Sequence, residues 1–301
     1  MRTKGFRWAG VLLAASSMVS HAQTKKLSFE VASIRESKAA GPSSMNFPLS
    51  IGPQYPTQGG LLTARNVPLL QLFVFAYAKN MYQIQGMRAQ LPEWARDMRF
   101  DVLARAEGNP TKDQMREMMR TLLEERFDVK MHTESRQVPV YQLVMAKPGK
   151  TGPRLKAFSD TEAACSNEAP PWGQQPPAPV TKVEGGYPAY CGAAVMMPAE
   201  SAGQTKVGGR RLTMADIATA VGGVGDIVDW PVLDRTGLSG TFDMMLEFAM
   251  DNPDPARAGL DMPLGPSLAA ALKEQLGLKM QSGKGSVEVV VLDHMEKPSD
   301  N

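Results

Sequence analysis

An internal repeat is the feature that most constrains this chain. The segment that starts at Leu122 aligns without a gap with the segment that starts at Ala271; they read LLEERFDVKMHTESRQVPVYQLVMAK and ALKEQLGLKMQSGKGSVEVVVLDHME. Two shorter echoes precede them, RFDVLARA at 99–106 with TFDMMLEF at 241–248, and LTARNVPL at 62–69 with LTMADIAT at 212–219. Such a repeat indicates that one supersecondary unit occurs more than once. We therefore predict a tandem of two related units.

Proline and glycine mark the boundary between these units. From residue 150 to residue 209 the chain contains PPWGQQPPAP and VEGGYPAYCG and shows no helical period, which is typical of a connecting segment. The expected organisation is a first unit over residues 23–149, a Pro/Gly-rich linker over 150–209 and a second unit over 210–301.

The first unit is expected to be a small sheet with two helices on one face. Apolar residues recur with helical spacing over residues 70–77, with Asn66 as the predicted cap. Thr111 and Gln114 have the spacing of a capping box for a second helix. Strands are predicted at 29–34, 82–87, 100–106, 129–133 and 138–145, the last two joined as a hairpin by the polar residues 135–137.

The second unit repeats this plan. One helix is predicted over residues 214–221, and another begins after Ser267 and ends at Gly277. Strands are predicted at 232–235 and 241–248, followed by a final hairpin that ends in VEVVVLDHM. The predicted fold class is therefore α+β, a tandem duplication of a β-α-β-β-α-β-β unit.

The first 22 residues have the pattern of a secretory signal peptide. Arg2, Lys4 and Arg7 give a basic start, and an apolar run follows to Val19. The small residues Ser20 and Ala22 then occupy the −3 and −1 positions of a cleavage site before Gln23. The run is about 12 residues long, whereas a membrane-spanning helix needs roughly 20. We expect an exported protein, periplasmic or secreted, with no membrane-spanning segment after cleavage. Removing those three of the 33 basic residues leaves 30 against 31 acidic residues, a balance that argues against nucleic-acid binding.

The two cysteines are expected to be bonded. An exported chain enters an oxidising compartment, where a lone cysteine pair is more often bridged than free, so we predict a disulfide between Cys165 and Cys191. The same linker carries Trp172, Tyr187 and Tyr190. These aromatic residues either contact a partner or pack over the boundary between the units.

The chain offers little for metal or acid–base chemistry. Three histidines and two cysteines are too few for a multi-histidine centre, a zinc ribbon or an iron–sulfur cluster. His132 and His294 occupy unrelated positions in the repeat, although either could act as a base beside a carboxylate such as Glu134 or Asp293. The glycines at 222–226 lack the spacing of a phosphate-binding loop. We therefore predict no catalytic residue, no metal site and no cofactor.

Several segments carry a family resemblance: FEVASIRES, GGLLTARNVPL, RFDVLARAEG, VLDRTGLSGTFDMMLEF and LKEQLGLKMQSGKGSVEVVVLDHMEKPSDN. They resemble a soil-associated family of secreted proteins abundant in Acidobacteria, a domain of unknown function, over nearly all of the mature chain. The order of helix, strands, helix and hairpin is similar, more weakly, to the short N-terminal module of secretins and TonB-dependent receptors, which docks other envelope proteins or peptides. The resemblance implies a location and an architecture but no active site.

These patterns favour a non-enzymatic exported protein that binds a protein or peptide partner in the cell envelope. The predicted binding surface is a strand edge at Val138, Pro139, Val140 and Tyr141, because proline has no N–H to give to a neighbouring strand and so suits an edge. There are two alternatives. One is a hydrolase that uses His294 or His132 with a nearby carboxylate, and the other is a sensor domain for a small molecule or peptide that is separate from its signalling partner.

Overall fold

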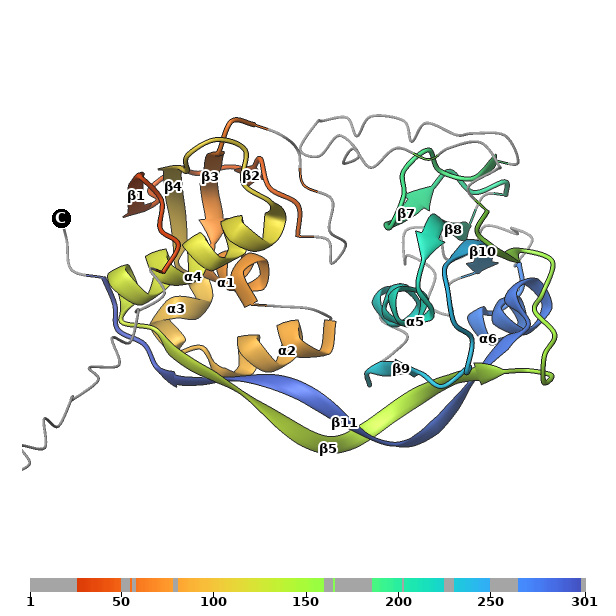
Figure 1. Cartoon of the computed structure of the whole chain (residues 1–301). Coiled ribbons are helices and arrows are strands. Elements are labelled where there is room, and N and C mark those ends of the chain that lie inside the picture. The colour runs from red at the N-terminus through yellow and green to blue at the C-terminus, as the bar shows by residue number, and fades with distance from the viewer. Residues whose placement is uncertain are drawn as a thin grey trace, which may run out of the picture.

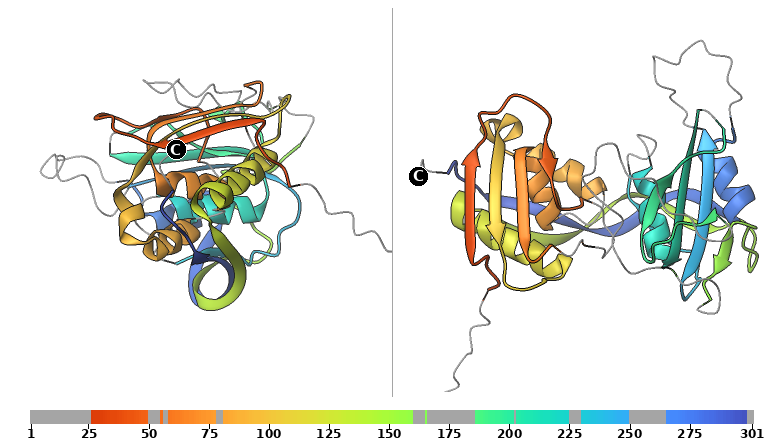
Figure 2. Two further views of the ribbon diagram at one scale, coloured as in Figure 1. Left: turned by 90° about the vertical axis from the view of Figure 1, so that its left-hand side faces the viewer. Right: turned by 90° about the horizontal axis from the view of Figure 1, so that it is seen from above.

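The protein consists of two α+β units joined by a long two-stranded ribbon. The computed structural model describes residues 26–49, 55, 58–77, 81–159, 165, 186–201, 203–224, 230–249 and 265–298. The ribbon runs beneath both units (Figure 1). From sheet to ribbon the molecule has three layers, with the helices between the outer sheets and the ribbon (Figure 2). The expected α+β class is confirmed.

The first unit is an antiparallel sheet in the order β1-β4-β3-β2. Every second residue of β4 is buried, so one face of the sheet packs on the helices and the other is exposed. The capping box of Thr111 and Gln114 begins α4 as predicted. The elements of the first unit are β1 (Val31–Glu36), β2 (Ser44–Met45), β3 (Leu61–Pro68), α1 (Leu69–Tyr77), α2 (Met81–Gln90), α3 (Glu93–Asp97), β4 (Arg99–Arg105) and α4 (Lys112–Phe127).

The second unit is built in the same way, with its sheet in the order β6-β10-β8-β7. Ser267 caps the helix before the last strand, and Gly277 ends it in the left-handed conformation (φ 71°), both as predicted. Its elements are β6 (Leu155–Ala157), β7 (Ala194–Met197), β8 (Gln204–Leu212), α5 (Met214–Gly223), β9 (Val232–Asp234), β10 (Phe242–Ala249), α6 (Leu268–Ala271) and the π-helical segment η3 (Leu272–Leu276).

Both sheets contain the same bulge at the same place. In the first sheet the bulge includes Asn66 (φ 52°), whose N–H donates to Asp101 on β4. In the second it includes Arg211 (φ 50°), whose N–H donates to Asp243 on β10. The flanking pairs also correspond: Ala64 with Val102 and Val67 with Phe100 in the first sheet, Gly209 with Met244 and Leu212 with Phe242 in the second.

Three sequence-based predictions of local structure are wrong. Asn66 does not cap a helix, because α1 begins at Leu69. Residues 82–87 lie in the helix α2 instead of a strand. The echo of 62–69 with 212–219 joins a strand to a helix; the matching bulges align Asn66 with Arg211 instead.

The two predicted hairpins are also wrong, because each is opened into one continuous strand. Strand β5 (Lys130–Met145) runs straight through residues 135–137, and β11 (Leu278–His294) is equally unbroken. The two strands pair antiparallel along their length, with Met145 opposite Leu278. Residues 135–137 contain no glycine, so they lack the chemistry of a tight hairpin turn.

The ribbon exchanges strands between the units. Its first end, with Met131 and Leu292, packs on the core of the first unit, and its other end places Leu143 and Leu278 in the core of the second. Each unit is therefore completed by chain from both halves of the sequence. On the first unit, helix α2 also covers the outer edge of β11, because Gln90 donates to Val290 O and accepts the Leu292 N–H.

The segment predicted as a linker belongs largely to the second unit. It supplies β6, β7 and most of β8 to the second sheet. The second unit thus begins well before residue 210. The predicted disulfide between Cys165 and Cys191 is present, with a Cα–Cα distance of 5.2 Å.

Candidate functional site

A pocket of about 350 Å³ lies where the helices of the first unit meet the ribbon. Three helices form one wall of the pocket, and each contributes one residue: Tyr77 from α1, Gln83 from α2 and Arg120 from α4. Both strands of the ribbon form the opposite wall, with Met131, His132, Thr133, Glu288 and Val290. The site therefore exists only because β11, from the end of the sequence, reaches the first unit.

Arg120 and Tyr77 give the pocket donors for hydrogen bonds. The Arg120 guanidinium lies over the Tyr77 ring, 5.9 Å from its centroid, and its Nη1 donates to Ala76 O at 2.7 Å. Burial raises the pKa of Tyr77 to about 12, with Glu124 adding to the rise, so the hydroxyl is neutral at physiological pH. Within the described residues that hydroxyl has no hydrogen-bond partner, and Arg120 uses its Nη1 alone.

His132 forms an ion pair at the edge of the pocket. Its Nδ1 lies 2.8 Å from Asp293 Oδ2, and its Nε2 lies 3.8 Å from Glu134 Oε2. The hydrogen bond to Asp293 raises the pKa of the imidazole, and the charges of Asp293 and Glu134 act in the same direction. Both ring nitrogens face carboxylates, so the ring is poised to carry a positive charge.

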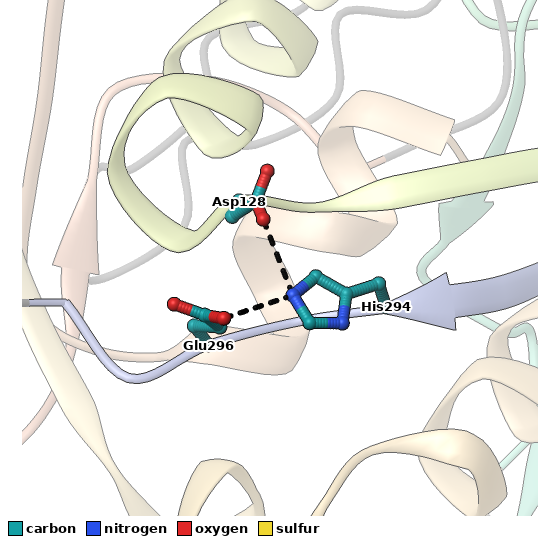
Figure 3. A group of neighbouring side chains, drawn as sticks. All are labelled: Asp128, His294 and Glu296. Carbon is teal, nitrogen blue, oxygen red and sulfur yellow. Dashed lines mark hydrogen bonds and ion pairs between the residues drawn. The ribbon is translucent and has the colours of Figure 1, made fainter.

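A second histidine cluster lies at the end of the ribbon (Figure 3). His294 Nε2 is 3.2 Å from Asp128 Oδ2 and 3.2 Å from Glu296 Oε1. By residue type these three side chains could hold a divalent cation. Lys130 Nζ, however, lies 3.3 Å from the same Asp128 oxygen and already supplies a positive charge. The backbone N–H of Glu296 also donates a hydrogen bond to Phe127 O. Together with the cluster, this bond holds the end of β11 against the end of α4.

The structure brings together the two histidines that seemed unrelated in the repeat. His294 pairs with Lys130 and His132 with Val291 in the ribbon register, so both lie at its first end. The aromatic residues of the predicted contact surface are elsewhere. Tyr187 and Tyr190 are half-buried beside the second sheet, and Trp172 lies outside the described residues.

The predicted docking edge is not free along its length. Tyr141 donates its N–H to Pro231 O beside the parallel partner β9, and Val140 is fully buried. Pro139 is opposite Lys284 of β11. The backbone nitrogens of residues two apart point to the same side of a strand, so the nitrogen of Pro139, like that of Tyr141, points away from β11. Pro139 lies before the first residue that pairs with β9, and its lack of an N–H therefore leaves no donor unpaired there. The expectation of an edge at Val138–Tyr141 is therefore wrong at Tyr141.

Sequence reasoning missed Tyr77, Arg120 and Glu288 as lining residues of the pocket. Tyr77 was part of a predicted apolar helix face, and no spacing relates it to the ribbon. Only the pairing of β11 with β5, over more than a hundred residues of separation, could have located the site.

Fold and pocket define a two-lobed α+β protein with a polar pocket on its shared ribbon. A family model described as a protein of unknown function, DUF3738, matches residues 70–295, and the chain belongs to this family. Comparison with curated proteins and with solved structures found no match. Among the described residues, no helix is long and apolar enough to cross a membrane.

Proposed function

We propose that this chain is an exported, non-enzymatic binding protein that holds a small carboxylate ligand, such as an amino acid or the end of a peptide, in the ribbon pocket. The observation that carries this proposal is the combination of Arg120 and the neutral Tyr77 hydroxyl, both with unused donors, in a pocket of about 350 Å³. A guanidinium binds a carboxylate with two parallel hydrogen bonds. Met131 and Val290 offer apolar surface to the rest of the ligand.

The hydrolase alternative receives less support from the same geometry. A catalytic histidine must take a proton from a nucleophile or a water. His132 instead directs Nδ1 to Asp293 and Nε2 toward Glu134. His294 directs Nε2 to two carboxylates. Both ring nitrogens of His132 and the Nε2 of His294 thus face carboxylates rather than a hydroxyl or thiol nucleophile.

The test is calorimetric titration of the mature chain with glutamate and with the dipeptide Ala-Glu. We expect binding that Arg120→Gln weakens at least tenfold, about 1.4 kcal/mol, and that Tyr77→Phe weakens less. Arg88→Gln is the matched control, because Arg88 is exposed on α2 outside the pocket. Binding that is unaffected by Arg120→Gln would contradict the proposal. Hydrolysis of Ala-Glu that His132→Ala abolishes would favour the hydrolase.

We also infer that the two units arose by duplication and that the protein is exported. Support for duplication comes from the shared sheet order and from the matching bulges at Asn66 and Arg211. The left-handed residues that end the two equivalent helices, Asp128 and Gly277, add to it. Support for export comes from the disulfide and the basic, apolar N-terminal segment.

A further inference from the structure

The outer faces of the two sheets differ in what covers them. In the second unit, Pro188 and Met197 approach β8 so closely that a side chain at Gly208 would collide with the Met197 sulfur. We call residues 186–201, which include these two and the edge strand β7, the strap. Beneath it the ion pair of Arg210 with Asp243, at 3.0 Å, has side chains only 3% and 4% exposed.

The charges under the strap are paired. Lys206 contacts Glu247 at 3.6 Å and also binds Glu200, which the strap itself contributes. Glu200 N–H in turn donates to Glu247 Oε1. Buried charges are tolerated when partners of opposite sign accompany them. The strap therefore adds its own carboxylate to the paired charges of this sheet face.

The corresponding face of the first sheet is open to solvent. It is the layer farthest from the ribbon, and strands β1, β4 and β3 are seen face-on in Figure 2, right. Val31 is 69% exposed and Leu103 is 58% exposed. We call this surface the arginine face; it consists of Val31, Arg35, Arg65, Arg99, Leu103 and Arg105.

The charges of the arginine face are not balanced. The outward positions of β1, β3 and β4 include one carboxylate, Asp101, which already accepts the N–H of Asn66. Among the described residues, the side chains of Arg35 and Arg65 have neither an ion-pair nor a hydrogen-bond partner. By register, Arg105 stands where the second sheet has Glu247. A surface that is paired in one unit thus has excess positive charge in the other.

The chain of the first unit does not provide an equivalent strap in its described part. After β2, the connection toward β3 turns to the helix side, where the Phe47 ring lies 4.6 Å from the Phe75 ring of α1. Phe47 is consequently buried in the core of the first unit.

We propose that the arginine face is a docking surface for an extended acidic segment of a partner protein, which covers the first sheet as the strap covers the second. The charge of the face selects carboxylates, because guanidinium groups bind them through paired hydrogen bonds. Leu103 lies at the centre of the face, between Ser33 of β1 and Thr63 of β3, and the arginines lie around it, as in a protein interface with an apolar centre and a polar rim. This inference does not depend on the ligand of the ribbon pocket.

The test measures binding of a fluorescent peptide of alternating glutamate and valine to the mature chain, by anisotropy. We expect saturable binding that the double variant Arg35→Glu, Arg65→Glu weakens at least tenfold. The pair Lys147→Glu, Lys279→Glu changes the net charge equally on exposed positions of the other half of the molecule and is expected to weaken binding less than twofold. Circular dichroism establishes that each variant is folded, and Arg35→Gln with Arg65→Gln serves if the charge reversals do not fold.

Several outcomes would overturn the proposal. These are absence of binding, equal weakening by both double variants, or equal binding of a lysine–valine peptide. Binding to vesicles that contain anionic lipid, with no binding of the acidic peptide, would assign the face to a membrane surface instead.

Discussion

Single side chains link the pocket of this protein to its ribbon. His132 lines the pocket from β5 and binds Asp293 of β11, so the same imidazole contributes to the pocket wall and to the contact between the two strands. Tyr77 and Arg120 contribute hydrogen-bond donors from two different helices. Tyr77 and Arg120 are not distinguished in the sequence. Their chemistry depends on neighbours that the ribbon supplies.

At this scale we predict a pH-dependent contribution of His132 to stability. Because Asp293 raises the pKa of His132, the ion pair stabilises the folded state fully below the ordinary histidine pKa and loses this effect as the pH rises through the raised value. His132→Gln should therefore lower the melting temperature at about pH 5 and leave it nearly unchanged at about pH 8. Asp293→Asn should behave in the same way. A deficit that is independent of pH in both variants would contradict this assignment.

At the scale of secondary-structure elements, the two sheets share a β-bulge but differ in its surroundings. The two bulges place an aspartate in the same position, yet the surroundings differ: Asp101 is exposed, whereas Asp243 is buried against Arg210. In the second sheet the Arg210 guanidinium binds this aspartate and lies over the Phe158 ring, 5.6 Å from its centroid. One local motif is thus a solvated turn in one sheet and part of a buried charge pair in the other.

We predict unequal costs for the same substitution in the two bulges. Asp243→Asn leaves the buried Arg210 without its carboxylate and should destabilise by about 3–5 kcal/mol. Asp101→Asn keeps an oxygen for the Asn66 N–H on an exposed surface and should cost less than about 1 kcal/mol. Urea unfolding of the two variants measures the difference. Equal costs would mean that the strap does not seal the second sheet in solution.

The whole molecule is held together by exchanged strands. Leu143 follows the helices of the first unit in the chain but lies in the core of the second. Leu292, near the end of the sequence, packs on the core of the first. Neither unit is complete without chain from the other half, so the stabilities of the two units are coupled.

Hydrogen exchange can test this exchange directly. Leu143→Ala should cost about 2–5 kcal/mol and should accelerate exchange of the α5 amides in the second unit more than those of α4. Leu292→Ala should have the opposite preference, with a smaller effect because the residue is only partly buried. If Leu143→Ala instead loosened the first unit, the hairpins would be closed within their own units in solution.

The sequence by itself determined the local features of this protein. Spacing and chemistry located the caps at Thr111, Ser267 and Gly277, the strands β4 and β10, and the cysteine pair. These depend on residues close together in the chain or on types with few options. The α+β class followed from the same patterns, because periods of two and of about 3.6 residues are written into each segment.

Tertiary structure alone decided how those segments combine. A closed hairpin and an exchanged ribbon bury the same side chains of β5 and β11, so residues 130–145 cannot distinguish them by hydrophobic pattern. The left-handed bulge at Asn66 and the helix α2 over residues 82–87 also depend on what packs against them. The pocket follows from this exchange, since Glu288 and Val290 reach Tyr77 only when the last strand crosses to the first unit. Contacts between residues far apart in the sequence stabilise this position of β11, and no local stretch of sequence encodes them.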